Sequence, residues 1–202
     1  MQVLFRRTLQ RLIGLMLAIR YKIVAVGTEH MPDCGAVILL GNHVSWLDWA
    51  LVQLPLRRPL RYLMDRSIYE WRTLNWFFRL GETIPVSPKA PKGAVEAAQN
   101  ALNHGDALVI FPEGGITHAC EIEKFYRGFE IMASKIEKGV IIPFYIEGMC
   151  GSRWSRSNRR FVPKRSGWRR VVTVHYGPPY PKESSAQTVR SRVIALKDSI
   201  AE

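Results

Sequence analysis

The sequence predicts an α/β fold: a single αβα domain with a mostly parallel sheet flanked by helices. Three observations lead to it. Short apolar runs alternate along the chain with longer helical patterns, which is typical of strands joined by crossover helices. The 202 residues suit one domain with one core. Because 47% of them are hydrophobic, the chain can bury enough apolar surface to fold.

A basic amphipathic helix is expected at residues 1–20. Its uninterrupted apolar run, 12–19, is too short to cross a bilayer, which takes about 20 residues. Arg20 and Lys22 follow where a signal peptide would carry its small-residue cleavage site. The pattern suits a helix that lies in a membrane interface. A helix packed on the domain core fits it equally well.

Apolar runs predict the next strands at 21–26, 36–40 and 60–64. Between the last two, residues 46–54 have a helical pattern that Pro55 stops. The chain therefore enters its sheet directly after the first helix.

The middle of the chain continues the alternation with a helix at 67–80, a short strand at 83–86 and an alanine-rich helix at 90–103. Glycine or proline follows each of these three elements. These residues are Gly81, Pro88 and Gly105.

The last elements are strands at 107–111, 140–147 and 170–176, with helices at 129–137 and 186–200. Ligands in such sheets bind outside the carboxyl ends of the strands. Polar loops that follow the strands are therefore the places to look for a site.

Three cysteines, Cys34, Cys120 and Cys150, are widely spaced and form no CxxC pair. An odd, scattered set argues against a disulfide framework and against a cysteine-rich zinc site. Each is therefore expected to be a small buried hydrophobic residue, in a reducing compartment.

The net charge of +12 points to an anionic partner. Nine lysines and arginines lie between residues 151 and 182, a stretch without acidic residues in which Trp154, Phe161 and Trp168 are interleaved. An anionic membrane surface and a single-stranded nucleic-acid groove suit this pattern equally well, and a solvated loop is the third interpretation. Residues 151–167 are the most flexible stretch expected.

His43 and Asp48 lie five positions apart in GNHVSWLDWA, residues 41–50, after a predicted strand. From the start of a helix, the Asp48 carboxylate can reach back to one imidazole nitrogen and leave the other free to accept a proton. On these residues alone, Asp48 could equally cap its own helix.

FPEGG, residues 111–115, follows another predicted strand. Gly114 and Gly115 beside Glu113 permit a substrate to approach closely. Exposed backbone N–H groups here could bind an anion or a developing oxyanion. A plain turn is the alternative.

The chain resembles the glycerophospholipid acyltransferases in four motifs taken together. These are NHVSWLD, FPEGG 68 residues after His43, FYRG at 125–128 and IIPF at 141–144. The family is that of the 1-acylglycerol-3-phosphate acyltransferases, and the resemblance covers residues 21–147. It is also similar to the acyltransferase part of multidomain lysophospholipid acyltransferase and acyl-carrier-protein synthetase proteins. Residues 21–202 are accordingly expected to form the acyltransferase domain, which leaves open that the chain was excised from a longer one.

The resemblance implies transfer of a fatty acyl group from an acyl-CoA or acyl-carrier-protein thioester to the hydroxyl of a lysophospholipid. It makes His43 the general base, oriented by Asp48, and assigns Glu113, Gly114 and Gly115 to the acceptor. It implies no metal, no cofactor and no acyl-enzyme. Ser45 is rejected as a nucleophile, because its surroundings lack the G-x-S-x-G elbow.

Arg127 in FYRG is a candidate contact for the acceptor phosphate, although a solvated surface charge is at least as good an interpretation. Lysophosphatidate acyltransferases of this family usually carry arginines where this chain has Ser87 and Ile116. A phosphate monoester is well served by bidentate arginine. The two missing arginines favour a phosphodiester acceptor resembling lysophosphatidylethanolamine over lysophosphatidate.

The expected protein is thus a monotopic enzyme on the cytoplasmic face of the membrane. Its expected partners are the lysophospholipid, the acyl donor, an anionic membrane surface and, through the basic stretch, an acidic acyl carrier protein, with no nucleic acid. A nucleic-acid-binding module and a non-catalytic lipid binder are the rival hypotheses. The nucleic-acid hypothesis gives no role to His43 or Asp48.

Overall fold

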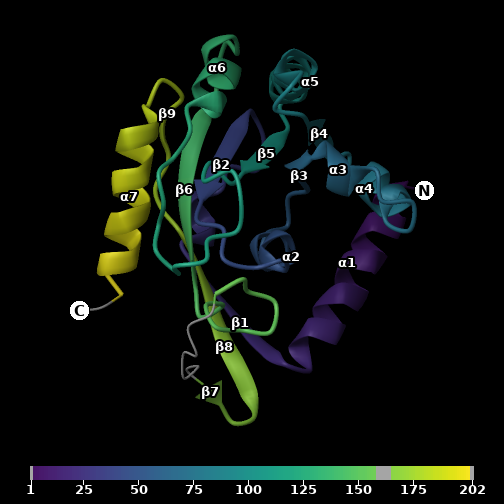
Figure 1. Cartoon of the computed structure of the whole chain (residues 1–202), viewed down its shortest axis with the longest axis vertical. Coiled ribbons are helices and arrows are strands. Elements are labelled where there is room, and N and C mark those ends of the chain that lie inside the picture. The colour runs from purple at the N-terminus through teal and green to yellow at the C-terminus, as the bar shows by residue number, and fades with distance from the viewer. Residues whose placement is uncertain (1, 158–164, 201–202) are drawn as a thin grey trace.

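The centre of the protein is a nine-stranded, mostly parallel sheet. Figure 1 shows the computed structural model, with helices on both faces of this sheet. The structure describes residues 2–157 and 165–200. The predicted α/β class is confirmed. The strands are β1 (Tyr21–Val26), β2 (Val37–Gly41), β3 (Leu60–Asp65), β4 (Ile84–Val86), β5 (Ala107–Ile110), β6 (Val140–Glu147), β7 (Arg165–Ser166), β8 (Arg169–Tyr176) and β9 (Tyr180–Pro181).

Seven α-helices and one 3-10 turn, Thr28–His30, complete the described elements. The α-helices are α1 (Gln2–Ala18), α2 (Asp48–Gln53), α3 (Arg66–Tyr69), α4 (Asn75–Leu80), α5 (Pro91–Asn103), α6 (Gly128–Ser134) and α7 (Ala186–Asp198). Most lie within a few residues of their predicted positions. The short strands β7 and β9 and the 3-10 turn were not predicted, because two or three residues are too few to show a hydrophobic period.

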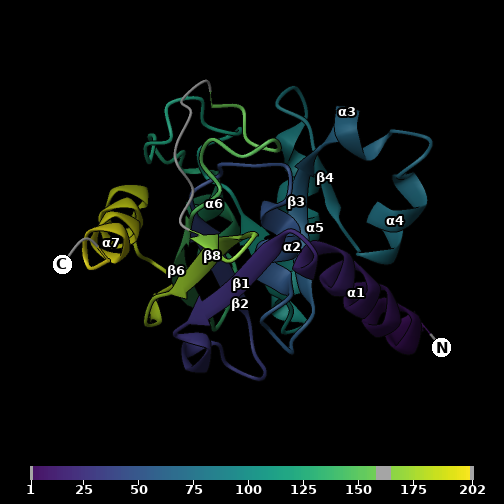
Figure 2. The same cartoon turned by 90° about the horizontal axis from the view of Figure 1, so that it is seen from below.

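Strand β2 is the fully buried centre of the sheet, and it divides the core into two layers. Its side chains alternate, since successive residues of a strand point to opposite faces. Ile38 and Leu40 pack under α5, α6 and α7, whereas Val37 and Leu39 pack toward α2. Figures 1 and 2 show α7 on one side of the sheet and α2 with α1 on the other.

The strand order β1-β8-β6-β2-β5-β3-β4 decides which loops meet. β2 pairs in parallel with both β5 and β6. The carboxyl ends of these three strands therefore lie at one edge of the sheet. The segments that begin at residues 42, 111 and 148 all leave from that edge, where ligands bind in sheets of this kind.

Helix α1 has two apolar stripes, one packed on the domain and one exposed. Leu9, Ile13 and Leu17 form a half-buried stripe at helical spacing, and Leu17 packs against the core. A second apolar stripe is more than half exposed and consists of Leu12, Leu15, Met16 and Ile19. The helix thus packs on the domain and still presents apolar side chains outward. Within the described chain, no helix is both long and apolar enough to span a bilayer.

The single helix predicted at 67–80 is wrong: the structure divides it into α3 and α4. Asp65 begins α3 by accepting a hydrogen bond from the N–H of Ser67. The side-chain amide of Asn75 donates to the carbonyl of Tyr69 at 2.7 Å. A side chain therefore satisfies a carbonyl at the end of α3, and the chain turns before α4 begins.

The prediction for the cysteines is also wrong. Cys120 and Cys150 form a disulfide with 5.8 Å between their Cα atoms, and Cys34 is exposed. Their separation of 30 residues carries no pairing signal; the two meet because β5 and β6 both flank β2. The expected reducing compartment rested on unpaired thiols and loses that support. Of the stretch predicted to be flexible, 158–164 lies outside the described residues, and 151–157 forms hydrogen-bonded turns.

Candidate active site

The structure brings His43 and Asp48 together just beyond the end of β2. The imidazole Nδ1 lies 2.8 Å from the Asp48 Oδ2. The carboxylate is fully buried, and the histidine side chain is 21% exposed. A carboxylate only accepts hydrogen bonds, so Nδ1 carries the proton and Nε2 is left with its lone pair. Among the described residues, Nε2 has no hydrogen-bond partner.

The Asp48 carboxylate is held by the residues just before it. Its Oδ2 also accepts from the N–H groups of Val44 at 2.7 Å and Ser45 at 2.9 Å. The hydroxyl of Ser45 donates to Oδ1. Residues 43–48 therefore wrap around the carboxylate, which is why α2 begins at Asp48 and not at Trp46. The Asp48 carboxylate therefore holds the histidine and the turn before α2, and no side-chain cap is formed at the start of that helix.

Two further contacts fix this segment to the sheet. Asn42, which is buried, donates to the carbonyl of Ile146 at 3.0 Å and accepts from its N–H at 2.7 Å. The side-chain amide thus takes the place of a backbone unit between β2 and β6. The N–H of Thr117 donates to the carbonyl of His43 at 2.8 Å. Residues from three strand ends hold the histidine in place.

Phe111 connects the histidine to the FPEGG turn. Its ring stacks on the imidazole with 4.1 Å between centroids and an interplanar angle of 15°. Phe111 in turn meets Phe144 edge to face at 5.9 Å. The apolar stack fixes one face of His43 and leaves its edge for proton exchange.

Glu113 lies buried at this edge with 6% of its surface exposed. Within the described part of the chain, neither carboxylate oxygen has a hydrogen-bond partner of good geometry. Burial raises the pKa of Glu113 to about 8, and repulsion from Glu123 adds to the effect. The nearby backbone N–H groups of His43 and Glu123 favour the charged form but do not offset burial. A buried, unsatisfied carboxyl can donate to or accept from a polyhydroxyl ligand.

The two glycines after Glu113 differ in backbone conformation and in the space that surrounds them. Gly114 has φ +76°, in the left-handed region, and a Cβ there would lie 3.3 Å from the Tyr126 ring. A Cβ placed on Gly115 would have no other heavy atom within 4 Å apart from its chain neighbours. Its N–H makes no hydrogen bond with any described residue. Gly114 therefore shapes the turn, and Gly115 leaves space and a free donor beside it.

Arg127 lies apart from these residues. Its side chain is 83% exposed and pairs with Glu130 at 2.8 Å. It lines a surface hollow with Lys124, Arg190 and the start of α7. The structure therefore groups His43, Asp48 and the 111–115 turn at one edge, and places Arg127 in a different hollow.

An apolar cavity adjoins the helix that carries Asp48. Trp49, the next residue, lines it and meets Phe77 edge to face at 5.2 Å. The remaining walls come from α1, β3 and α4, through Leu9, Ile13, Leu60, Tyr62, Met64, Phe78 and Leu80 among others. Trp46, in contrast, is exposed, with Arg156 stacked over its ring at 5.1 Å.

Sequence reasoning missed Ser45, Asn42 and Phe111 as parts of the site. For Ser45 only a nucleophilic role was considered, and its hydrogen bond to the Asp48 carboxylate was not predicted. For Phe111 and Asn42 the only available signal was position, since Phe111 ends one predicted strand and Asn42 lies two residues after another. What they touch depends on which strands are neighbours, which a single sequence does not state.

The fold and the matched segment define the class of protein: the chain belongs to the acyltransferase family. A family model described as Acyltransferase matches residues 22–147, which run from β1 to the end of β6.

More particularly, its relatives include 1-acyl-sn-glycerol-3-phosphate acyltransferases of the PlsC type. The chain is 26% identical over 120 residues to one from Chlamydomonas reinhardtii, matching 57% of this chain and 36% of that protein. It is 25% identical over 123 residues to one from Borreliella burgdorferi, matching 59% and 49%. The chain thus matches between about a third and a half of the length of these two curated relatives.

A third relative carries a different acceptor in its name. This lyso-ornithine lipid O-acyltransferase of Rhodobacter capsulatus is 25% identical over 112 residues, covering 54% of this chain and 38% of that protein. Among solved structures, the 1-acyl-sn-glycerophosphate acyltransferase PlsC of Thermotoga maritima shares the fold, with a TM-score of 0.66 at 19% identity. That match covers 90% of this chain and 72% of the other.

Proposed function

We propose that this chain transfers a fatty acyl group from a thioester, acyl-CoA or acyl carrier protein, to the free hydroxyl of a lysophospholipid, with His43 as the general base. The observation that carries the proposal is the His43 Nδ1–Asp48 Oδ2 bond of 2.8 Å at the carboxyl edge of the sheet. It orients a basic nitrogen next to a turn with a buried, unsatisfied carboxyl. The family membership supports acyl transfer as the chemistry.

The reaction needs only proton transfer and positioning. Nε2 of His43 takes the proton of the acceptor hydroxyl as its oxygen attacks the thioester carbonyl. A C–O bond forms, the C–S bond breaks, and the departing thiolate receives the proton from the imidazolium. The Asp48 carboxylate stabilises that transient cation. The free N–H of Gly115 is available for the negative charge on the carbonyl oxygen.

The acceptor is proposed to be a phosphodiester lysolipid resembling lysophosphatidylethanolamine. Ser87 follows the end of β4, and Ile116 is buried directly after the FPEGG turn. Neither side chain can form the bidentate ion pair that a phosphate monoester favours. Glu113 is assigned to hydroxyl groups of the acceptor backbone. The names of the relatives differ at this point, so they leave the choice of acceptor to experiment.

The apolar cavity beside Trp49 is assigned to a fatty acyl chain. Its walls are mostly apolar and aromatic, with Gln10, Gln53 and Thr83 as polar side chains among them, as expected for a site that takes hydrocarbon from water. Because Trp49 directly follows Asp48 in α2, the cavity adjoins the helix that carries the carboxylate.

The protein is proposed to work on the cytoplasmic face of an anionic membrane, peripherally bound through α1. The exposed apolar stripe of α1 supports this, and basic residues flank it at Arg7, Arg11, Arg20 and Lys22. Trp71, Leu74 and Trp76 add exposed apolar surface in the segment around α4, and both views place α4 beside α1 (Figures 1 and 2). Tryptophan and basic residues together favour such an interface.

Acyl transfer with a panel of acceptors and both donor types tests the proposal. His43→Ala should lower turnover by about 10²–10⁴, the usual contribution of a positioned base. His104→Ala is the matched control, since His104 is exposed and precedes β5 at the opposite edge of the sheet. Near wild-type turnover of a folded His43→Ala enzyme rejects the general-base role. A clear preference for lysophosphatidate over lysophosphatidylethanolamine rejects the proposed acceptor.

A further inference from the structure

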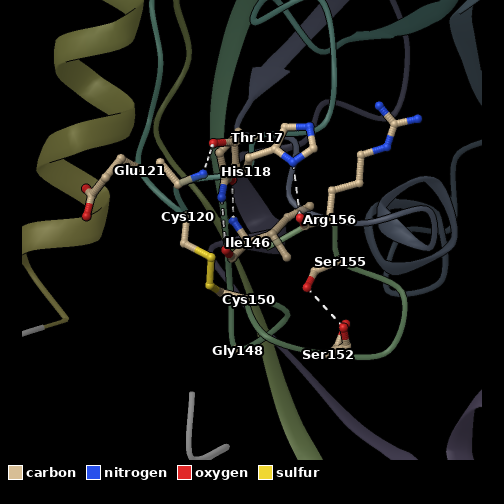
Figure 3. The surroundings of a disulfide bond; sticks show 12 residues. Thr117, His118, Cys120, Glu121, Ile146, Gly148, Cys150, Ser152, Ser155 and Arg156 are labelled. Carbon is tan, nitrogen blue, oxygen red and sulfur yellow. Dashed lines mark hydrogen bonds between the residues drawn. A yellow bond between two sulfur atoms is a disulfide. The ribbon is translucent and has the colours of Figure 1, made fainter. Parts of the chain in front are cut away.

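The Cys120–Cys150 bridge joins two segments that leave the sheet at the site edge. Cys120 lies between the FPEGG turn and Phe125, and Cys150 lies in the turn after β6. Figure 3 shows the bridge beside a second link, in which His118 Nδ1 lies 3.1 Å from the carbonyl of Arg156. Covalent and polar contacts therefore hold the same two segments together.

Each of these segments also contacts the segment that carries His43 and Asp48. From the Cys120 side, the N–H of Thr117 donates to the carbonyl of His43 at 2.8 Å. From the Cys150 side, the carbonyl of Trp154 accepts from the N–H of Trp46 at 3.1 Å, and Ser155 pairs with Ser45 as a β-bridge. The bridge thus closes a ring of contacts around residues 43–48.

The Cys120 backbone depends on its surroundings. Its φ of +61° lies in the left-handed region, which non-glycine residues adopt only where neighbouring contacts hold them. Nearby, the hydroxyl of Thr117 donates to Glu123, the carboxylate that repels Glu113. A change in the Cys120 segment would therefore reach both Glu113 and the carbonyl of His43.

Both bridged cysteines are half-buried, and their neighbours Ala119, Glu121 and Arg153 are exposed. The bridge therefore lies in a partly exposed surface segment. In cytosolic proteins of ordinary organisms, disulfides are usually transient and redox-sensing. On the cytoplasmic face proposed above, a partly exposed bridge next to the site suits that use.

We propose that Cys120 and Cys150 form a reversible dithiol–disulfide site that controls acyl transfer, the disulfide form being the more active one. The inference rests on the proposed function for its activity readout. Oxidation proceeds by exchange with a small-molecule disulfide. One cysteine thiolate attacks it and forms a mixed disulfide; the second cysteine then attacks the mixed disulfide, which forms the Cys120–Cys150 bond and releases the small molecule in its thiol form. Two electrons pass to the small disulfide, which leaves with two thiol groups, both in one molecule when it is dithiothreitol, and reduced dithiothreitol reverses the reaction.

The test uses the intact wild-type chain, equilibrated with oxidised or with reduced dithiothreitol, then alkylated and weighed by mass spectrometry. We expect one alkylated cysteine, Cys34, in the oxidised sample and three in the reduced sample. Three alkylated cysteines in both samples would overturn the proposal.

Activity is measured on the same two samples before alkylation. Reduction should lower kcat/KM for the acceptor roughly fivefold or more, the usual size of a coupling between sites. Cys34→Ser, the control at the exposed cysteine, should respond to reduction as the wild type does. Cys120→Ser and Cys150→Ser should show the reduced rate under both conditions. Equal rates of the oxidised and the reduced wild-type enzyme would contradict the proposal. This comparison uses the wild-type chain alone and does not depend on the folding of a variant.

Amide hydrogen exchange separates this proposal from the proposed function. In the reduced form, the N–H groups of Trp46 and Thr117 should exchange faster than in the oxidised form. If no acceptor is acylated in either state, faster exchange still supports redox control of the segment, whereas the proposed function fails. If the bridge forms and exchange is unchanged, redox control is rejected.

Discussion

Replacing Asp48 with asparagine should lower both stability and turnover, because it removes a buried charge and leaves the shape almost unchanged. Oδ2 accepts three N–H hydrogen bonds, from His43, Val44 and Ser45, and Oδ1 accepts the Ser45 hydroxyl. An asparagine can keep this pattern by donating its amide to the Ser45 hydroxyl. What it loses is the negative charge that strengthens the three N–H bonds.

The loss in stability follows from those three bonds. Hydrogen bonds to a charged group contribute about 1 kcal/mol more than neutral ones, which gives about 3 kcal/mol in total. Easier burial of a neutral amide returns about 1 kcal/mol of this. A net loss of about 2 kcal/mol corresponds to a Tm about 4–8 °C lower for a chain of this length.

The loss in turnover follows from the imidazolium that forms in the proposed reaction. With Nδ1 at 2.8 Å from Oδ2, the charge centres lie about 4 Å apart. Their attraction is then about 4 kcal/mol at an effective dielectric constant of about 20. That value is an upper bound, so we expect turnover to fall by about 10²–10³.

Thermal unfolding followed by circular dichroism gives the Tm, and release of thiol from acyl-CoA gives the turnover. Asp65→Asn is the control, since Asp65 caps α3 with an exposed carboxylate and lies outside the described site. An Asp48→Asn protein that melts within about 1 °C of the wild type and turns over within about threefold of it would refute the reasoning.

Three further changes test other parts of the structure. The pKa of Glu113, about 8 when folded, lies above the ordinary 4.5, so the folded protein keeps a proton that the unfolded chain releases. Stability should therefore fall by up to about 1.4 kcal/mol per pH unit between about pH 4.5 and 8, and Glu113→Gln should remove this slope in unfolding measured across that range. Leu15→Glu should weaken sedimentation with anionic vesicles, whereas Ile131→Glu, at an exposed apolar residue of α6, should not; equal effects would contradict docking through α1. Gly114→Ala should lower the Tm by about 2–8 °C because its φ of +76° costs an alanine about 1–2 kcal/mol. Gly115→Ala should leave the Tm unchanged because a Cβ there has open space; a similar drop in both variants would contradict this difference.

Periodic patterns were enough to predict the α/β class and most of its elements. The sequence of β2 is a continuous apolar run because both faces of this strand are buried, and such a run predicts a strand. The pattern of α5 predicts a helix because its buried apolar residues, Ala94, Ala98, Ala101 and Leu102, recur at helical spacing. The break between α3 and α4 was not predictable in this way. It depends on one amide, that of Asn75, reaching a carbonyl six residues earlier.

The local part of the site was predictable, and its distant part was not. His43 and Asp48 are close in sequence, so their contact follows from the geometry of a turn before a helix. Phe111 meets His43, and Cys120 meets Cys150, only because β5 and β6 both lie beside β2. A single sequence predicts strands more readily than it predicts their neighbours. For the same reason Arg127, adjacent to the site motifs in sequence, lies in a separate hollow.

The hydrogen bonds that hold the Asp48 carboxylate all come from residues 43–45. The histidine and its carboxylate thus form a self-contained unit of six residues. The positions to which the proposed function assigns the choice of acceptor, Ser87 and Ile116, lie on other segments, after β4 and β5. Under that assignment, acceptor choice can change by substitutions that leave the His43–Asp48 unit intact. This division would let one scaffold diversify over many lipids at little risk to its chemistry.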